Sequence, residues 1–286
     1  MGTFIVFPIL YLFASVFFTY MVHRQPRRPV RESPDWGTVT DTRIPAADGG
    51  FLEVWRIEPD GPSRGIVVLA HGWGRNRDRM VSRARMFGKW GYTTVIHSAR
   101  DHGGSSPCRM MNGIRFGEDI GSVLGWVGEP VILYGHSAGS AGAAIAAHRH
   151  PELVSLLFLE GSYADVKPAL FSLYKSFNRY FGLIFGPAII FWMDKVLYRE
   201  RLEALSPVAL APEINVPVLL IHGQSDATFP VAFAKKLARS FPGNGATLWI
   251  ARGAGHSDSS LQPGYREAVG RFLEAHWFPA DAAVNG

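Results

Sequence analysis

The chain has 286 residues, which fits one large α/β domain or two small ones. Hydrophobic residues make up 47% of it and charged residues 19%, so a buried core is possible and general disorder is excluded. The net charge is +5, but the arginines gather in two groups without any nucleic-acid motif, so no nucleic-acid partner is predicted.

The N-terminal stretch has the length and composition of a membrane anchor. Residues 3–22 carry no charge and are mostly apolar, and about twenty helical residues span the roughly 30 Å hydrocarbon core. Basic residues follow this run instead of preceding it, and no small-residue cleavage site is present, which favours an uncleaved anchor over a signal peptide. We therefore expect a single-pass anchor at residues 1–25, a Pro- and Arg-rich linker at 26–37, and a domain at 38–286 on the cytoplasmic side.

Alternating strand and helix patterns follow the linker. Short apolar runs predict strands at residues 38–44, 51–57, 66–70, 93–97, 131–134, 153–159, 216–221 and 246–251. Apolar residues at three- and four-residue spacing predict helices at 78–90, 116–127, 230–240 and 262–276, and the Ala- and Gly-rich residues 140–148 predict another. The alternation predicts an α/β fold with a mostly parallel central sheet that is covered by helices on both faces.

One insertion interrupts the alternation. Residues 162–213 contain an aromatic and aliphatic middle, 177–197, which is broken by Asn178, Gly186 and Pro187. These breaks argue against a second membrane span. We expect a helical cap over the site, or a segment at a membrane interface.

The sequence Gly135-His136-Ser137-Ala138-Gly139 lies between a predicted strand and a predicted helix. Glycine on both sides suits a sharp turn that holds the serine in a strained backbone conformation. The following helix would direct its first N–H groups at charge beside Ser137. In a chain with 31 glycines this motif is weak by itself, so its meaning depends on the rest of the chain.

Three further polar stretches follow predicted strands. They are His71-Gly72-Trp73-Gly74, His222-Gly223-Gln224-Ser225-Asp226 and Gly253-Ala254-Gly255-His256. Ligands of a parallel sheet gather at the carboxyl ends of its strands, so we expect these stretches to meet the serine turn there.

With these motifs in this order, the chain resembles an α/β-hydrolase from about residue 38 to its C-terminus. The resemblance implies a serine-nucleophile hydrolase of esters and related acyl bonds. Ser137 needs a base, His256 suits that role, and Asp226 would orient the imidazole. Asp165 and Asp258 compete with Asp226 for the third role, and the His-Gly-x-x-Asp context favours Asp226.

The family pattern also implies the oxyanion hole. Its backbone N–H donors would be those of Trp73 and Ala138. His71 and Gly72 are expected to support the oxyanion loop, and the glycine-rich loop 101–105 has no predicted catalytic role.

The leading expectation is a membrane-anchored serine esterase or lipase, because an anchor and an apolar cap favour acyl or lipid esters. Peptidase, thioesterase and acyltransferase activities use the same triad and stay open, as does a non-catalytic scaffold. No metal or cofactor is expected: the only cysteine is Cys108, and no phosphate-binding glycine loop is present. The sequence leaves the oligomeric state open.

Overall fold

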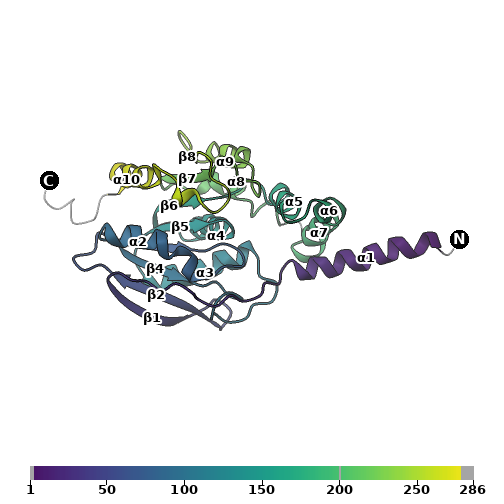
Figure 1. Ribbon diagram of the computed structural model, residues 1–286, viewed down its shortest axis with the longest axis horizontal. Coiled ribbons are helices and arrows are strands. Elements are labelled where there is room, and N and C mark those ends of the chain that lie inside the picture. Colours follow the sequence, from purple (N-terminus) through teal and green to yellow (C-terminus); the bar gives the residue numbers. More distant parts are fainter. Residues whose placement is uncertain (1–2, 200, 278–286) are drawn as a thin grey trace.

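The computed structural model describes residues 3–199 and 201–277, in which one eight-stranded sheet organises the chain (Figure 1). The strand order is β1-β2-β4-β3-β5-β6-β7-β8. The pairs β1–β2 and β2–β4 are antiparallel and all the others are parallel. The strands are β1 Thr38–Pro45, β2 Phe51–Glu58, β3 Ile66–Ala70, β4 Thr93–His97, β5 Val131–His136, β6 Val154–Glu160, β7 Val218–Gly223 and β8 Thr247–Ala251.

Helices bury both faces of this sheet. In β3 the residues alternate: Val67 and Leu69 face a core with α2 and α10, while Val68 and Ala70 face a core with α3, α4 and α9. These helices are α2 Val81–Lys89, α3 Gly113–Val127, α4 Ala138–Arg149, α9 Val231–Ala238 and α10 Tyr265–His276. The predicted α/β architecture is therefore confirmed, because strands buried on both faces appear in the sequence as continuous apolar runs.

A helical cap is inserted between β6 and β7. It contains α5 Val166–Phe177, α6 Arg179–Ile184 and α7 Gly186–Trp192, followed by one π-helical turn, Met193–Leu197, and the short α8 Pro207–Leu210. The breaks noted in the sequence delimit these helices: the Asn178 side chain accepts a hydrogen bond from the N–H of Phe181 and begins α6, and Pro187 lies in the first turn of α7. Of these helices, α7 lies beside α1, whereas α8 lies beside α9 (Figure 1).

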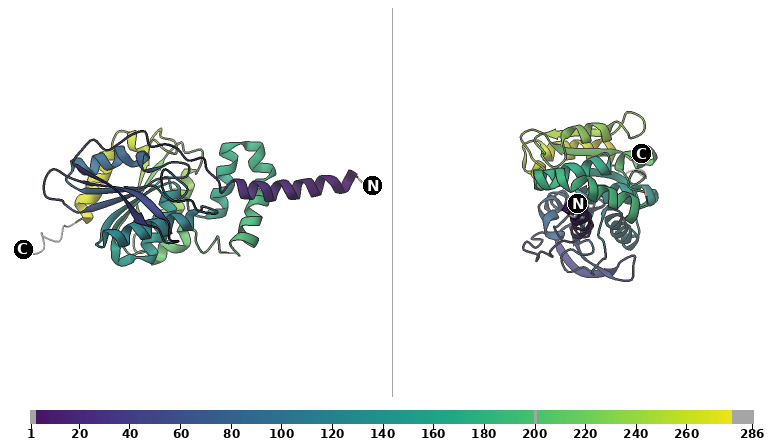
Figure 2. Two further views of the ribbon diagram at one scale, coloured as in Figure 1. Left: turned by 90° about the horizontal axis from the view of Figure 1, so that it is seen from below. Right: turned by 90° about the vertical axis from the view of Figure 1, so that its right-hand side faces the viewer.

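The N-terminal helix α1, Thr3–Met21, packs on this cap along one face. The side chains of Ser15 and Thr19 are buried there, and Trp192 Nε1 donates a hydrogen bond to Ser15 Oγ over 2.9 Å. The ring of Phe18 meets two aromatic rings of the cap edge-on. The helix is therefore an additional cap element, and its first turns extend beyond the cap along the long axis of the molecule (Figure 2).

The prediction of a spanning anchor is not supported. Within residues 3–199 and 201–277, no helix combines the length and the apolarity that crossing a membrane requires. The sequence interpretation treated residues 3–22 as a uniform apolar run. The structure gives the run two different faces: Ser15, Phe18 and Thr19 lie toward the cap, whereas Phe7 and Phe13 on the outward side are 73% and 68% exposed.

Candidate active site

The serine turn joins β5 to α4. Ser137 has φ +56°, a left-handed conformation that costs a non-glycine residue on the order of 1–3 kcal/mol. A Cβ atom on Gly135 would lie 2.4 Å from the backbone oxygen of Gly139, and one on Gly139 would lie 2.4 Å from that of His71. The glycines therefore permit the close approach of three backbone segments that lifts Ser137 out of the sheet.

Three side chains predicted from separate motifs meet at this turn. Ser137 Oγ lies 2.8 Å from His256 Nε2, and His256 Nδ1 lies 2.8 Å from Asp226 Oδ2. Because an ionised carboxylate only accepts hydrogen bonds, His256 carries its proton on Nδ1, and Nε2 is left to accept the hydroxyl proton of Ser137. The three groups form one continuous chain of hydrogen bonds.

The Asp226 carboxylate is fully enclosed by protein. Its other oxygen, Oδ1, accepts hydrogen bonds from the backbone N–H groups of Thr228 and Phe229, each over 2.8 Å. Burial alone would raise the pKa of this carboxyl, but the hydrogen bonds and the nearby imidazole outweigh it and lower the pKa. The competing aspartate, Asp165, instead forms an ion pair with Lys236 at 2.7 Å.

The loop after β3 lies against the serine turn. A Cβ atom on Gly72 would lie 2.9 Å from that of Ser137, so only glycine permits this approach. His71 accepts a hydrogen bond from the N–H of Ala99 at Nε2, and its Nδ1 donates to the carbonyl of Gly72 over 2.7 Å. This imidazole thus fixes the path of the loop from two sides.

The two predicted oxyanion donors lie on the same cavity as Ser137. Among the described residues, the N–H groups of Trp73 and Ala138 have no hydrogen-bond acceptor, and both residues line the cavity. Unpaired donors beside a nucleophile are suited to an oxygen on which negative charge develops.

The sequence interpretation did not identify His102 as part of this support. Its Nε2 accepts a hydrogen bond from the N–H of Gly74 over 3.0 Å, and its Nδ1 donates to the carbonyl of Arg100. The glycine-rich loop after β4 therefore holds the far end of the oxyanion loop. In the sequence, only the position of this loop after β4, the neighbour of β3 in the sheet, indicated such a role.

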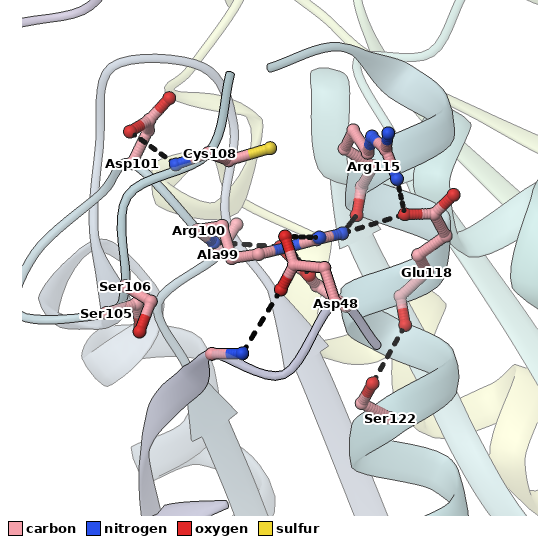
Figure 3. Close-up of polar contacts among 12 residues, drawn as sticks. Asp48, Ala99, Arg100, Asp101, Ser105, Ser106, Cys108, Arg115, Glu118 and Ser122 are labelled. Atoms are coloured by element: carbon pink, nitrogen blue, oxygen red, sulfur yellow. Dashed lines mark hydrogen bonds and ion pairs between the residues drawn. The ribbon is translucent and has the colours of Figure 1, made fainter. Parts of the chain in front are cut away.

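Arg100 fixes that glycine-rich loop to the rest of the domain (Figure 3). Its buried guanidinium forms ion pairs with Asp48 in the β1–β2 turn at 2.5 Å, and with Glu118 and Asp119 on α3 at 2.8 and 2.5 Å. Of these carboxylates Asp119 is fully buried, so moving the guanidinium away would leave a buried charge without its partner, and this resists displacement of the loop.

A buried ion pair also lies beneath the serine turn. Glu160, the last residue of β6, receives two hydrogen bonds of 2.6 Å from Arg83 on α2, and a third from the hydroxyl of Tyr134 over 2.7 Å. The backbone carbonyl of Glu160 accepts the N–H of Ser137 over 2.9 Å. The sequence interpretation missed this group, although an acid that ends an apolar strand is a visible signal.

This ion pair makes stability depend on pH. Burial alone would raise the pKa of Glu160, but the Arg83 guanidinium and the hydrogen bonds outweigh it and lower the pKa from 4.5 to about 2. A depressed carboxyl pKa contributes stability above pH 4.5 that is lost as the pH falls toward 2. We expect Glu160→Gln to cost about 3–5 kcal/mol at neutral pH, since Arg83 stays buried without its partner. Urea unfolding from pH 7 to pH 3 should show the difference from wild type shrinking on the acid side.

The matched control is Glu267→Gln, which removes the exposed ion pair with Arg271 on α10. An exposed pair contributes little, so this variant should follow the wild-type curve at every pH. A difference between wild type and Glu160→Gln that stays constant with pH would contradict the assignment.

A cavity of about 340 Å³ opens at Ser137 and His256. Most of its wall is apolar, and the cap contributes Leu170, Leu173, Met193, Leu202 and Leu205 to it. Val22 and His23, which come just after α1, also line it. No aspartate or glutamate lies among the described residues of this wall.

Two family models together match almost all of the domain. A family model described as serine aminopeptidase, S33, matches residues 61–201, and one described as TAP-like protein matches residues 201–284. The two matches are adjacent, and together they include all four motifs of the site.

Individual proteins show weaker but extensive similarity. A monoacylglycerol lipase of Mycolicibacterium smegmatis is 26% identical over 227 residues, which cover 67% of this chain and 81% of the lipase. An uncharacterized membrane protein of Saccharomyces cerevisiae is 21% identical over 232 residues, which cover 78% of this chain and 75% of that protein. Among solved structures, an esterase of Pyrococcus furiosus matches with a TM-score of 0.70 and 17% identity, over 88% of this chain and 99% of the esterase.

Proposed function

The chain belongs to the α/β-hydrolase superfamily, and from this premise we propose that it cleaves carboxylic esters, with Ser137 as nucleophile, His256 as base and Asp226 as orienting acid. The observation that supports this most is the hydrogen-bonded chain of two 2.8 Å steps, which ends at the cavity. Nε2 of the imidazole accepts the hydrogen bond of the serine hydroxyl and is therefore placed to take its proton.

The first half of the reaction acylates the enzyme. As Ser137 Oγ bonds to the ester carbonyl carbon, His256 Nε2 takes the hydroxyl proton, and the carbonyl electron pair moves onto oxygen. The backbone N–H groups of Trp73 and Ala138 donate to that oxyanion. When the intermediate collapses, the bond to the alcohol oxygen breaks, and the alcohol leaves with the proton from His256.

The second half repeats these steps with water. His256 takes a proton from a water molecule, whose oxygen bonds to the acyl carbon. The same two N–H groups receive the oxyanion, and the bond to Ser137 Oγ breaks. The serine recovers its proton from the imidazole, and the carboxylic acid leaves. Asp226 stays ionised throughout and stabilises the imidazolium of each step.

The cavity supports an ester with an apolar acyl group. Its volume of about 340 Å³ is within the usual range for small-molecule sites, and its cap side is lined by aliphatic side chains. The relative named monoacylglycerol lipase and the fold neighbour named esterase agree with this chemistry. We therefore assign an acyl ester of a small alcohol as the substrate class.

The aminopeptidase activity named by one family model has less support. An aminopeptidase must recognise the positively charged amine of a peptide, and a charge taken out of water needs a partner of opposite sign. The described cavity wall has no carboxylate, and it includes the basic residue Arg75. Thioesterase and acyltransferase activities need the same three groups and are separated by substrates only.

A matched substrate panel tests the proposal. We expect p-nitrophenyl esters to be hydrolysed with kcat/KM rising from acetyl to octanoyl, because each buried methylene contributes about 0.8 kcal/mol. The corresponding octanoyl thioester and an aminoacyl p-nitroanilide serve as comparison substrates. Faster turnover of the anilide, or a kcat/KM that falls with acyl length, would contradict an apolar acyl site.

A further inference from the structure

Three polar side chains from three distant parts of the chain meet on the wall of the cavity. They are His23, just after α1, Asn112, which caps the N-terminus of α3, and Tyr198, after the π-helical turn of the cap. Tyr198 Oη lies 2.9 Å from His23 Nε2 and 3.0 Å from Asn112 Nδ2. The rest of the wall is mostly apolar, so a polar cluster of this kind indicates a polar group in the ligand.

The hydrogen-bond directions are determined by the neighbours of this group. His23 Nδ1 lies 2.7 Å from the backbone carbonyl of Thr19, so it must donate, and Nε2 must accept. The hydroxyl of Tyr198 therefore donates to His23. The amide of Asn112 donates to Tyr198 Oη and to the carbonyl of Met110, while its oxygen accepts two N–H groups of α3.

Both titratable groups stay neutral in this arrangement. Burial lowers the pKa of His23, although its hydrogen bond to Thr19 opposes this. Burial raises the pKa of Tyr198 to about 12, although the hydrogen bond from Asn112 opposes this. The donors and acceptors of His23 and Asn112 are all in use. Tyr198 Oη donates its proton to His23 and accepts one hydrogen bond from Asn112, and a second donor can approach this oxygen only outside the ring plane, where the hydrogen bond is weaker. Within the described chain, no group donates to it from there.

We propose that Tyr198 Oη accepts a hydrogen bond from an aliphatic hydroxyl of the bound substrate. This inference rests on the proposed function, because it assigns a second recognition point to the ester that Ser137 attacks. The ligand class is an acyl ester with a free hydroxyl, located either on the alcohol, as in a monoester of a polyol, or on the acyl chain. His23 and Asn112 are positioning residues that hold the phenol.

The cap-facing side of α1 helps to hold His23 in position. His23 is fixed through the helix backbone at Thr19, and α1 is fixed to the cap by Ser15 and by Tyr11, whose hydroxyl donates to the carbonyl of Ile184 over 2.7 Å. The N-terminal helix thus positions one residue of the cavity wall, His23.

The test compares two substrate pairs with the same acyl length. The first pair is a glycerol monoester and the propyl ester, and the second is a propyl ester with and without a hydroxyl on the acyl chain. One neutral hydrogen bond predicts a three- to tenfold higher kcat/KM for the hydroxylated member of one pair. In Tyr198→Phe that ratio should fall to about one, whereas Tyr180→Phe, at an exposed cap position, should keep the wild-type ratio. The pair that responds identifies the position of the hydroxyl.

A binding measurement separates this inference from the proposed function. Non-hydrolysable alkyl ethers of glycerol and of propanol are titrated into wild type and Tyr198→Phe, with tryptophan fluorescence as the readout, because Trp73 lines the cavity. If wild type hydrolyses no ester, the proposed function is wrong, and the ether affinities then decide the subsite alone. Equal affinity of wild type for both ethers, together with no preference in either ester pair, overturns the inference even if Tyr198→Phe does not fold.

Discussion

We expect Ser137→Ala to lower kcat for ester hydrolysis by about 10⁶-fold, the size of effect seen when a serine protease loses its nucleophile. Without the hydroxyl, His256 has no proton to take and no acyl-enzyme forms. The hydrogen bonds of the oxyanion hole and the cavity stay, so a residual rate above that of water is expected. Labelling by a fluorophosphonate probe should disappear in the same variant, because the probe bonds to the serine oxygen.

Ser176→Ala is the matched control. Ser176 is exposed on α5, where its hydroxyl donates only to a carbonyl of its own helix. This variant should be labelled and should turn over ester like wild type. If Ser137→Ala is labelled as strongly as wild type, the nucleophile is a different residue.

The central sheet and the serine turn could be predicted from the sequence because each depends on local patterns. Strands buried on both faces leave continuous apolar runs, as in Ile66–Ala70, and glycine is required where backbones approach as closely as at Gly135 and Gly139. The convergence of His71, Ser137 and His256 follows from topology, since all three come after parallel strands.

Other features depend on contacts that no local pattern encodes. Arg83 and Glu160 lie 77 residues apart, and His23 and Tyr198 lie 175 residues apart. A hydropathy average over residues 3–22 also cannot distinguish a helix that is apolar all round from one whose few polar residues share a face. Ser15 and Thr19 share the buried face of α1, which packs on the cap.

These two kinds of information have different consequences for function. The proposed reaction depends on motifs that each follow one strand, so its candidate groups are identifiable from the sequence. The choice of substrate depends on the cavity wall, to which the cap, the start of α3 and the residues just after α1 contribute. Tyr198 has no motif around it, and only the position of Asn112 and His23 beside it indicates a role.

Asp226→Asn should lower kcat by about 10⁴-fold, as the equivalent change does in a serine protease with the same triad. The structure explains why the substitution is more than a loss of charge. Oδ1 of Asp226 accepts the N–H groups of Thr228 and Phe229, so an asparagine places its oxygen there and its NH₂ group toward His256. His256 Nδ1 must then accept, its proton moves to Nε2, and Nε2 can no longer take the proton of Ser137.

Asp165→Asn separates this explanation from the alternative acid. Asp165 pairs with Lys236 at 2.7 Å, and its removal should change kcat by less than twofold, because an ion pair with an exposed lysine contributes little. Stopped-flow acylation with a p-nitrophenyl ester measures both variants. The expected result is slow acylation in Asp226→Asn with KM almost unchanged, since the carboxylate lies behind the imidazole and does not line the cavity. A rise in KM with normal acylation would instead make Asp226 a residue that shapes the binding site, and a large loss in Asp165→Asn would transfer the orienting role to that residue.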